Sequence, residues 1–179
     1  MAETPAVRIW TSRGVFTALC FFLIMGSLLP LNTMPRAWAP PDVLLALTFA
    51  WVVRRPDFVP VWLVGAIFLL TDMLYDRPPG LWTAVIVLAT EYLRKRAVSM
   101  RNLPFPVEWM TVAMVAVAAT LAYRVILAAT LLPVPPLDLT AIQLLATLIT
   151  YPLVAGLSHW LFNVRRVSPG EVDSLGHRL

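Results

Sequence analysis

The sequence predicts an all-α membrane protein: a compact bundle of six transmembrane helices with both termini in the cytoplasm. Composition is the first observation, because 59% of the 179 residues are hydrophobic, 13% are charged and the mean hydropathy is +0.77. These values lie outside the range of soluble domains. The second observation is length. Residues 109–132 contain one charged side chain and residues 139–162 contain no Asp, Glu, Lys or Arg, so each run can cross a hydrocarbon core about 30 Å thick.

The third observation is the distribution of positive charge. Cytoplasmic loops of membrane proteins retain Lys and Arg, because moving these charges outward during insertion is unfavourable. Eleven of the 14 Lys and Arg residues lie in four stretches, before the first, after the second, after the fourth and after the sixth apolar run: Arg8 and Arg13; Arg54 and Arg55; Arg94, Lys95, Arg96 and Arg101; Arg165, Arg166 and Arg178. The alternate connections carry only Arg36 and Arg77, so the basic side is predicted to be cytoplasmic.

The first span is expected at residues 15–29, and Pro30 ends it because proline interrupts a helix. The preceding residues 1–13 are too few to bury a core and are expected to form a cytoplasmic tail. Two arginines before the run and Ala37-Trp38-Ala39 after it also resemble a cleaved secretory signal. The five further apolar runs favour a retained anchor.

The second span is expected at residues 42–53, where the carboxylate of Asp42 can accept backbone N–H groups at the helix start. The third is expected at residues 58–74 and the fourth at residues 81–92. The second and fourth have about a dozen apolar residues each, which cover less than about 20 Å. Either the bilayer thins around them or one of them is re-entrant. The alternation of charge favours full crossing.

The fifth and sixth spans are expected at residues 109–132 and 139–162, followed by a short cytoplasmic tail at residues 163–179. The whole chain, residues 1–179, then forms a single membrane domain. Pro152 is expected to kink the sixth span. The same span carries a stripe of polar side chains that needs partners inside the bundle or on another chain: Thr140, Gln143, Thr147, Thr150 and Ser158.

Polar and ionisable side chains inside a membrane are the default functional candidates. Arg124 in the fifth span can bind an anion, pair structurally with Asp72 or Asp42, or reach the outer headgroups. Asp72 lies near the outer end of the third span. The candidates for intramembrane polar or partner contacts are Asp72, Arg124, Gln143, Thr147 and Thr150.

The sequence predicts no enzyme, no cofactor and no metal site. Glu91 precedes Arg94 by three positions and Lys95 by four, which predicts a local ion pair with one or the other. His159 stands beside Trp160, as is typical of an interfacial residue, and has no metal-ligand neighbours at a suitable spacing. The single cysteine, Cys20, lies inside the first apolar run and cannot form a disulfide framework within one chain. No HExxH motif and no phosphate-binding glycine loop occur.

Besides the intramembrane residues, two further surfaces are candidate contact sites. The cytoplasmic surface can meet anionic lipid or an acidic partner, or its charges can only fix the orientation of the chain: Arg54, Arg55, Arg94, Lys95, Arg96 and Arg101. The second surface is the periplasmic turn between the third and fourth spans, in which two prolines stop one helix and a glycine permits the turn: Asp76, Pro78, Pro79 and Gly80. The basic residues flank apolar spans, which favours lipid over nucleic acid as their counter-charge.

A set of short elements, in a fixed order between Pro41 and Leu161, resembles the MreD family of rod-shape-determining membrane proteins. The set comprises Pro41-Asp42 at the start of the second span, Trp51, Arg54, Arg55 and Pro56 at its end, Gly65 and Asp72 in the third span, the turn Pro78-Pro79-Gly80-Leu81, the basic loop, and Tyr151-Pro152-Leu153 in the last span. Asp76 and Pro79 depart from the family pattern, where a small residue and an aliphatic residue are usual.

The resemblance implies a six-span protein of the bacterial inner membrane, with a fold similar to the substrate-binding components of energy-coupling-factor transporters. It implies a non-enzymatic scaffold or regulator of the cell-elongation complex, which helps to control peptidoglycan synthesis and cell shape. The implied partners are MreC, and directly or through MreC also MreB, RodA and a class B penicillin-binding protein. The alternative function is a small-molecule, vitamin-like binding or transport subunit, with Arg124, Gln143 and Asp72 lining a pocket open to the periplasm.

Overall fold

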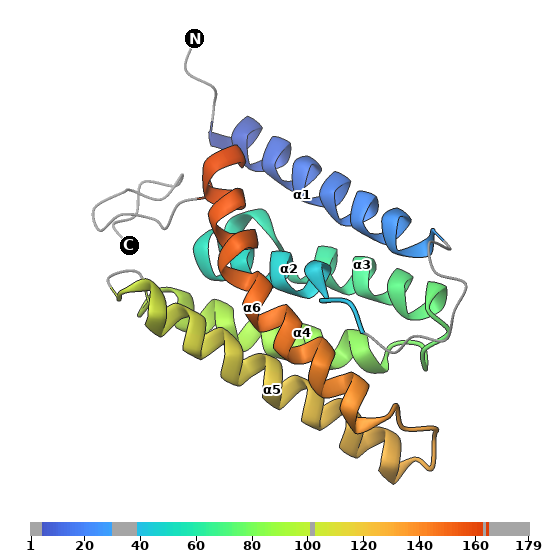
Figure 1. Ribbon diagram of the computed structural model, residues 1–179. Coiled ribbons are helices and arrows are strands. Elements are labelled where there is room, and N and C mark those ends of the chain that lie inside the picture. The colour runs from blue at the N-terminus through green and yellow to red at the C-terminus, as the bar shows by residue number, and fades with distance from the viewer. Residues whose placement is uncertain (1–4, 30–38, 101–102, 163, 165–179) are drawn as a thin grey trace.

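The computed structural model describes residues 5–29, 39–100, 103–162 and 164, and every element of secondary structure among them is helical. The expectation of an all-α chain is confirmed (Figure 1). In chain order the elements are α1 (Pro5–Leu28), α2 (Val43–Arg54), the 3-10 turn η1 (Pro56–Phe58), α3 (Val61–Leu74), α4 (Leu81–Ala97), α5 (Phe105–Ala129) and α6 (Leu137–Phe162).

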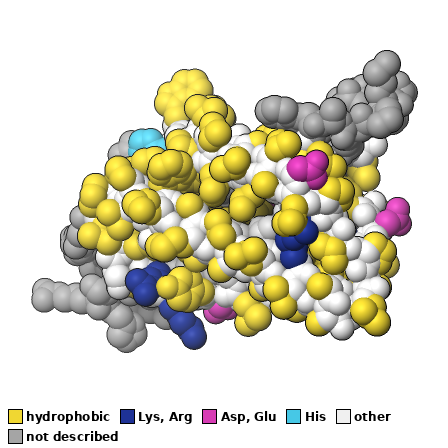
Figure 2. Space-filling model, turned by 60° about the horizontal axis from the view of Figure 1, so that its bottom comes forward, with side chains coloured by type: hydrophobic (Ala, Val, Ile, Leu, Met, Phe, Trp, Pro, Cys, Tyr) yellow, Lys and Arg dark blue, Asp and Glu magenta, His cyan; other side chains and the backbone are white. Residues whose placement is uncertain are grey.

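Among the described residues, three helices are long and apolar enough to cross a membrane: Val7–Leu28, Phe105–Ala129 and Leu137–Phe162. They are α1, α5 and α6. The apolar helices α2 and α3 are shorter, and α4 ends in Arg94, Lys95 and Arg96. Figure 2 shows a face of the molecule that is covered mostly by hydrophobic side chains, with few charged ones. The structure therefore supports a membrane protein, and crossing by all six helices stays a prediction.

Helix α2 is the centre of the bundle. Residues 44–53 are all buried, and α2 packs against α1, α4 and α6. In Figure 1, α6 crosses in front of α2, while α1 and α5 lie at opposite edges of the bundle. A helix that is apolar on nearly every side must be covered by other elements or by lipid, and here other elements cover it. At 1.5 Å per residue its 12 residues span about 18 Å, a length that suffices for a helix covered by protein.

The side-chain contacts define two ends of the bundle. At the basic end, Arg13 of α1 donates to the carbonyl oxygen of Asp57 at 3.1 Å, and Arg94 of α4 donates to that of Pro56 at 2.7 Å. At the opposite end, the hydroxyl of Ser27 in α1 hydrogen-bonds to that of Tyr75 after α3. The described members of three of the four basic stretches thus lie at one end. The fourth stretch, Arg165 to Arg178, lies outside the described residues.

The start of α2 agrees with the sequence. The backbone N–H of Leu45 donates to Oδ1 of Asp42 at 2.9 Å, so the expected carboxylate cap is confirmed. The turn between α3 and α4 depends on Gly80, whose φ is +83°. A side chain at this φ is strained even though a Cβ would meet no neighbour within 4 Å, because only glycine adopts left-handed backbone conformations at little cost.

The Gly80→Ala variant is expected to lower the free energy of unfolding by about 1 kcal/mol, since alanine resists a positive φ. Gly156→Ala is the matched control, because Gly156 lies within α6 and a Cβ there also meets open space. Alanine favours a helix over glycine, so the control is expected to be neutral or stabilising. Thermal unfolding in mild detergent compares the two. Equal destabilisation by both changes would refute this role of Gly80.

Candidate functional site

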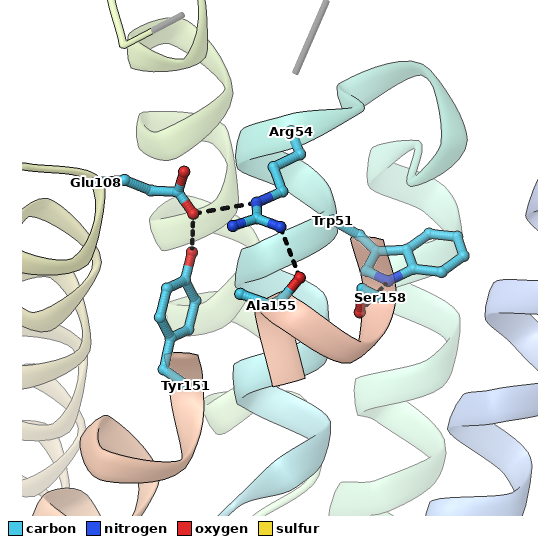
Figure 3. A network of polar contacts seen from close by, with 6 residues as sticks. All are labelled: Trp51, Arg54, Glu108, Tyr151, Ala155 and Ser158. Atoms are coloured by element: carbon cyan, nitrogen blue, oxygen red, sulfur yellow. Dashed lines mark hydrogen bonds and ion pairs between the residues drawn. The ribbon is translucent and has the colours of Figure 1, made fainter. Parts of the chain in front are cut away.

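Three helices meet at a buried ion pair at the basic end (Figure 3). Arg54, the last residue of α2, places its Nε 3.2 Å from Oε1 of Glu108 in the first turn of α5. The hydroxyl of Tyr151, in the middle of α6, donates to the same carboxylate oxygen at 2.9 Å. Nη1 of Arg54 donates to the carbonyl oxygen of Ala155 at 2.6 Å. One guanidinium therefore ties α2 to α5 and to α6.

The burial of this ion pair explains why the stability of the bundle depends on it. The side chain of Glu108 is 0% exposed and that of Arg54 is 10% exposed. A buried charge is tolerated when it is paired and hydrogen-bonded, and removing one partner leaves the other uncompensated. The sequence indicated Arg54 as a cytoplasmic contact for lipid or a partner. The structure instead directs its guanidinium into the bundle, where it stabilises helix packing.

The polar stripe of α6 finds partners on α2. The backbone N–H of Asp42 donates to Oγ1 of Thr147 at 2.8 Å, and the indole N–H of Trp51 donates to Oγ of Ser158 at 3.1 Å (Figure 3). These bonds lie at the two ends of α2, so the central helix is fastened to α6 along its length. Thr150 instead donates to the carbonyl oxygen of Ala146 within α6.

Pro152 provides a further link between α5 and α6. Because proline has no N–H, the carbonyl oxygen four residues earlier, that of Leu148, loses its helical donor. The indole N–H of Trp109 in α5 donates to this oxygen at 3.0 Å. The proline thus exposes an acceptor inside a helix, and a neighbouring helix uses it.

Arg94 anchors α4 at the same end of the bundle. Its Nη1 and Nη2 donate to the carbonyl oxygens of Pro56 and Val59 at 2.7 and 2.6 Å. Its Nε lies 2.7 Å from Oε1 of Glu91, which confirms the local ion pair expected from the spacing. Arg94, like Arg54, is occupied by contacts within the chain.

The remaining members of the predicted basic surface differ in exposure. Lys95 and Arg96 are exposed, and the guanidinium of Arg96 lies over the ring of Tyr92. Arg55 is half-buried and lies over the ring of Phe58. Arg101 lies outside the described residues. The exposed positive charge of the basic end therefore includes Lys95 and Arg96, at the C-terminus of α4, where cations also interact favourably with the helix dipole.

Asp72 caps a helix other than its own. It is 0% exposed, and its Oδ2 accepts hydrogen bonds from the backbone N–H groups of Gly80 and Thr83, both at 3.1 Å, and from Oγ1 of Thr83 at 2.8 Å. The first N–H groups of α4 thus find an acceptor on α3, as free N–H groups at a helix start require. The role that the structure gives Asp72 is to fix the α3–α4 turn.

A cavity of about 770 Å³ opens at the opposite end, with walls from α2, α4, α5 and α6. We call it the Arg124 cavity. Its lining includes two of the predicted polar residues besides Arg124, namely Gln143 and Thr147, and part of the predicted turn, namely Asp76, Pro78 and Pro79. Asp72 is absent from the lining, so the pocket that was expected to combine Arg124, Gln143 and Asp72 forms around the first two.

Arg124 is half-buried and held by neutral acceptors. Its Nη1 donates to the carbonyl oxygen of Pro135 and to Oγ1 of Thr140, both at 2.8 Å. Among the described residues no carboxylate lies within ion-pairing distance of it. The structural pairing with Asp72 or Asp42 that the sequence allowed is therefore not formed.

Sequence reasoning missed two members of the basic-end network. Glu108 was overlooked because it stands just before the apolar run of residues 109–132 and looks like an interfacial charge. Tyr151 was noted only as part of a motif. The pair Arg54 and Arg55 after α2 could have indicated Glu108. If one of these arginines is buried, it needs a carboxylate at the same depth in the membrane.

The described residues contain no group of three or more His, Cys, Asp or Glu side chains that could hold a metal ion. Comparisons with protein-family models, curated proteins and solved structures gave no match.

Glu108→Gln is expected to lower the free energy of unfolding by about 3 kcal/mol, since it leaves Arg54 buried without a counter-charge. Tyr151→Phe removes one hydrogen bond to a charged group, and we expect a loss of about 2 kcal/mol. Tyr92→Phe is the matched control, because Tyr92 is 47% exposed, and little change is expected. Thermal or denaturant unfolding in detergent measures all three.

The double variant Glu108→Gln with Tyr151→Phe tests whether the residues act as a unit. Contacting side chains in one network are non-additive, so the double variant is expected to be less destabilised than the sum of the single variants. Strict additivity would contradict the shared hydrogen bond.

Proposed function

We propose that this chain is a non-enzymatic membrane scaffold of the bacterial cell-elongation complex, a protein of the MreD type in the inner membrane. In this role it binds MreC and helps to control peptidoglycan synthesis and cell shape. MreB, RodA and a class B penicillin-binding protein are partners directly or through MreC. The proposal rests on the ordered sequence pattern between Pro41 and Leu161.

One observation carries the proposal further than the pattern alone. Pattern residues that are far apart in the sequence contact the same small region: Arg54 and Tyr151 both bind Glu108, and Trp51 binds Ser158. Elsewhere in the fold, the pattern residue Asp72 accepts a hydrogen bond from the backbone N–H of the pattern glycine Gly80. Replacing one of these residues would disturb the packing of the residue that it contacts. A sequence pattern that marks a fold is expected to contain residues coupled in this way. The match is therefore supported by physical coupling among its members.

The surfaces that these internal contacts do not cover suit a protein that acts by binding partners. The outer side of α1 presents Trp10, Phe21 and Phe22, which are 63%, 55% and 73% exposed. A lipid-embedded helix tolerates such a side, and a partner helix can pack on it. At the basic end, Lys95 and Arg96 offer positive charge to an acidic segment of a partner.

The test is co-purification of the full chain with an MreC-type protein from co-expressing cells in mild detergent. We expect a stable complex. A properly folded chain that never retains an MreC-type partner would contradict the proposal. Glu108→Gln offers a control for specificity, because a weakened fold should reduce recovery of the chain and of the complex together.

The basic end can be tested separately. The double charge reversal Lys95→Glu with Arg96→Glu is expected to reduce recovery of the complex several-fold if the partner offers acidic side chains there, since like charges across an interface repel. The matched control reverses an exposed charge at the opposite end, Asp138→Lys, and is expected to leave recovery unchanged. Unchanged recovery in the double variant would assign these two charges to lipid contact or orientation alone.

The second candidate function is a vitamin-like binding or transport subunit. The Arg124 cavity favours it, because its volume of about 770 Å³ falls within the usual range for small-molecule pockets, about 300–1,000 Å³. A panel of water-soluble vitamins is added to the purified chain, and thermal stability is measured. A vitamin that raises the melting temperature, without any MreC-type partner in the complex, would favour this function over the scaffold.

A further inference from the structure

The Arg124 cavity combines a charged group with an apolar wall. Its apolar lining includes Leu45 of α2, Leu127 of α5 and Leu144 of α6. Polar groups approach it from the same helices, among them Tyr123, Arg124 and Gln143. A space of this kind fits a molecule with a polar head and an apolar tail better than it fits a wholly polar solute.

Arg124 has donors to spare. A guanidinium carries five N–H donors in a planar fork. The hydrogen bonds of Arg124 to described residues use only Nη1, on Pro135 and Thr140. Nε and Nη2 thus have no hydrogen-bond partner among the described residues. Two such donors can bind the two oxygens of a carboxylate or phosphate, a geometry that arginine favours.

The other charged residues of the lining come from the start of α2 and from the α3–α4 turn. Asp42, at the start of α2, interacts electrostatically with Arg77 of the α3–α4 turn. Asp76 of the same turn is exposed. The guanidinium of Arg77 is also stacked over the rings of Tyr75 and Trp82. Among the described residues neither of these carboxylates forms an ion pair with Arg124, on the α5 side of the cavity.

The wall contains one more donor without a partner. Trp82 is 7% exposed, and its indole N–H has no hydrogen-bond partner among the described residues. Buried polar groups in proteins are nearly always hydrogen-bonded. A ligand with acceptor oxygens suits a cavity wall of this composition better than a hydrocarbon alone.

The position of Arg124 along α5 suits the head of a membrane amphiphile. Arg124 lies five residues before the end of the helix at Ala129, which is about 7.5 Å along its axis. In a helix that spans the membrane, this depth is close to the headgroups, where arginine side chains meet phosphates. An amphiphile can enter from the bilayer with its head at this level.

We propose that the Arg124 cavity binds an anionic amphiphile. Its phosphate or carboxylate group lies on Nε and Nη2 of Arg124, and its apolar chain lies along Leu45, Leu127 and Leu144. The scaffold function does not require this site, so the inference goes beyond it. If no amphiphile binds, the proposed MreC interaction is unaffected. If no MreC-type partner binds, the proposed amphiphile site is unaffected.

The experiment measures the thermal stability of the full chain in a neutral detergent with three probes. Dioctanoyl phosphatidylglycerol supplies an anionic head and tails, dioctanoylglycerol supplies tails alone, and inorganic phosphate supplies the anion alone. At ten times its dissociation constant, the first probe is expected to raise the melting temperature by about 4 °C. The other two are expected to give less than half of this shift.

Two variants assign the site. Arg124→Gln is expected to abolish the shift with dioctanoyl phosphatidylglycerol. Arg124→Lys keeps the charge but cannot form the two-pronged contact, so it is expected to fold normally and to lose at least half of the shift. Lys95→Gln is the matched control, because it also removes one positive charge, from an exposed position at the basic end, and it is expected to keep the full shift.

Each alternative outcome overturns a stated part of the proposal. A full shift with inorganic phosphate would make the ligand a soluble anion and not an amphiphile. A full shift with dioctanoylglycerol would mean that the cavity binds tails and that Arg124 recognises nothing. A shift that survives unchanged in Arg124→Lys, or that disappears in Lys95→Gln, would place binding outside the Arg124 cavity.

Discussion

The bundle depends on covering one short helix completely. Helix α2 is apolar over its whole circumference, and residues 44–53 are buried without exception. Exposure of that surface to water would be unfavourable in proportion to the apolar area. A helix of this length also cannot match the thickness of a bilayer without distortion. Packing α1, α4 and α6 around α2 resolves both difficulties, and the long apolar helices α1, α5 and α6 are left to face the lipid.

Surrounding a helix with protein creates a second requirement, because its polar ends must then be satisfied without water. At one end Thr147 accepts from the backbone of Asp42. At the other, Trp51 and Arg54 contact Ser158, Ala155 and Glu108. The polar stripe of α6 and the buried carboxylate of α5 are thus consequences of the buried α2. They also explain why the buried pair of Arg54 and Glu108 serves the packing of helices. Arg124 differs, because it lines a cavity and its Nε and Nη2 have no hydrogen-bond partner among the described residues.

The helical class, the cap at Asp42 and the Glu91–Arg94 pair could be predicted from the sequence, because each depends on neighbours within a few residues. The burial of α2 inside the bundle could not be predicted, because an apolar run of a dozen residues has the same sequence pattern whether lipid or protein surrounds it. Arg54 illustrates the same limit: its position after an apolar run indicates an interface, but its partner Glu108 is 54 residues away. The sequence singled out Asp72 as an intramembrane polar contact, but its role as a cap for α4 depends on a turn whose geometry is set by Gly80. Pairings between distant segments require the fold itself.

The central claim is that α2 is shielded from lipid, and brominated acyl chains test it directly, because they quench tryptophan fluorescence on contact. Two single-tryptophan variants are reconstituted in brominated phospholipid, one retaining Trp51 of α2, which is 1% exposed, and one retaining Trp160 of α6, which is 79% exposed. The other tryptophans are replaced by phenylalanine in both. The account predicts that Trp160 loses most of its emission while Trp51 keeps most of its own. Equal quenching of the two would mean that α2 faces the bilayer, and would contradict the account.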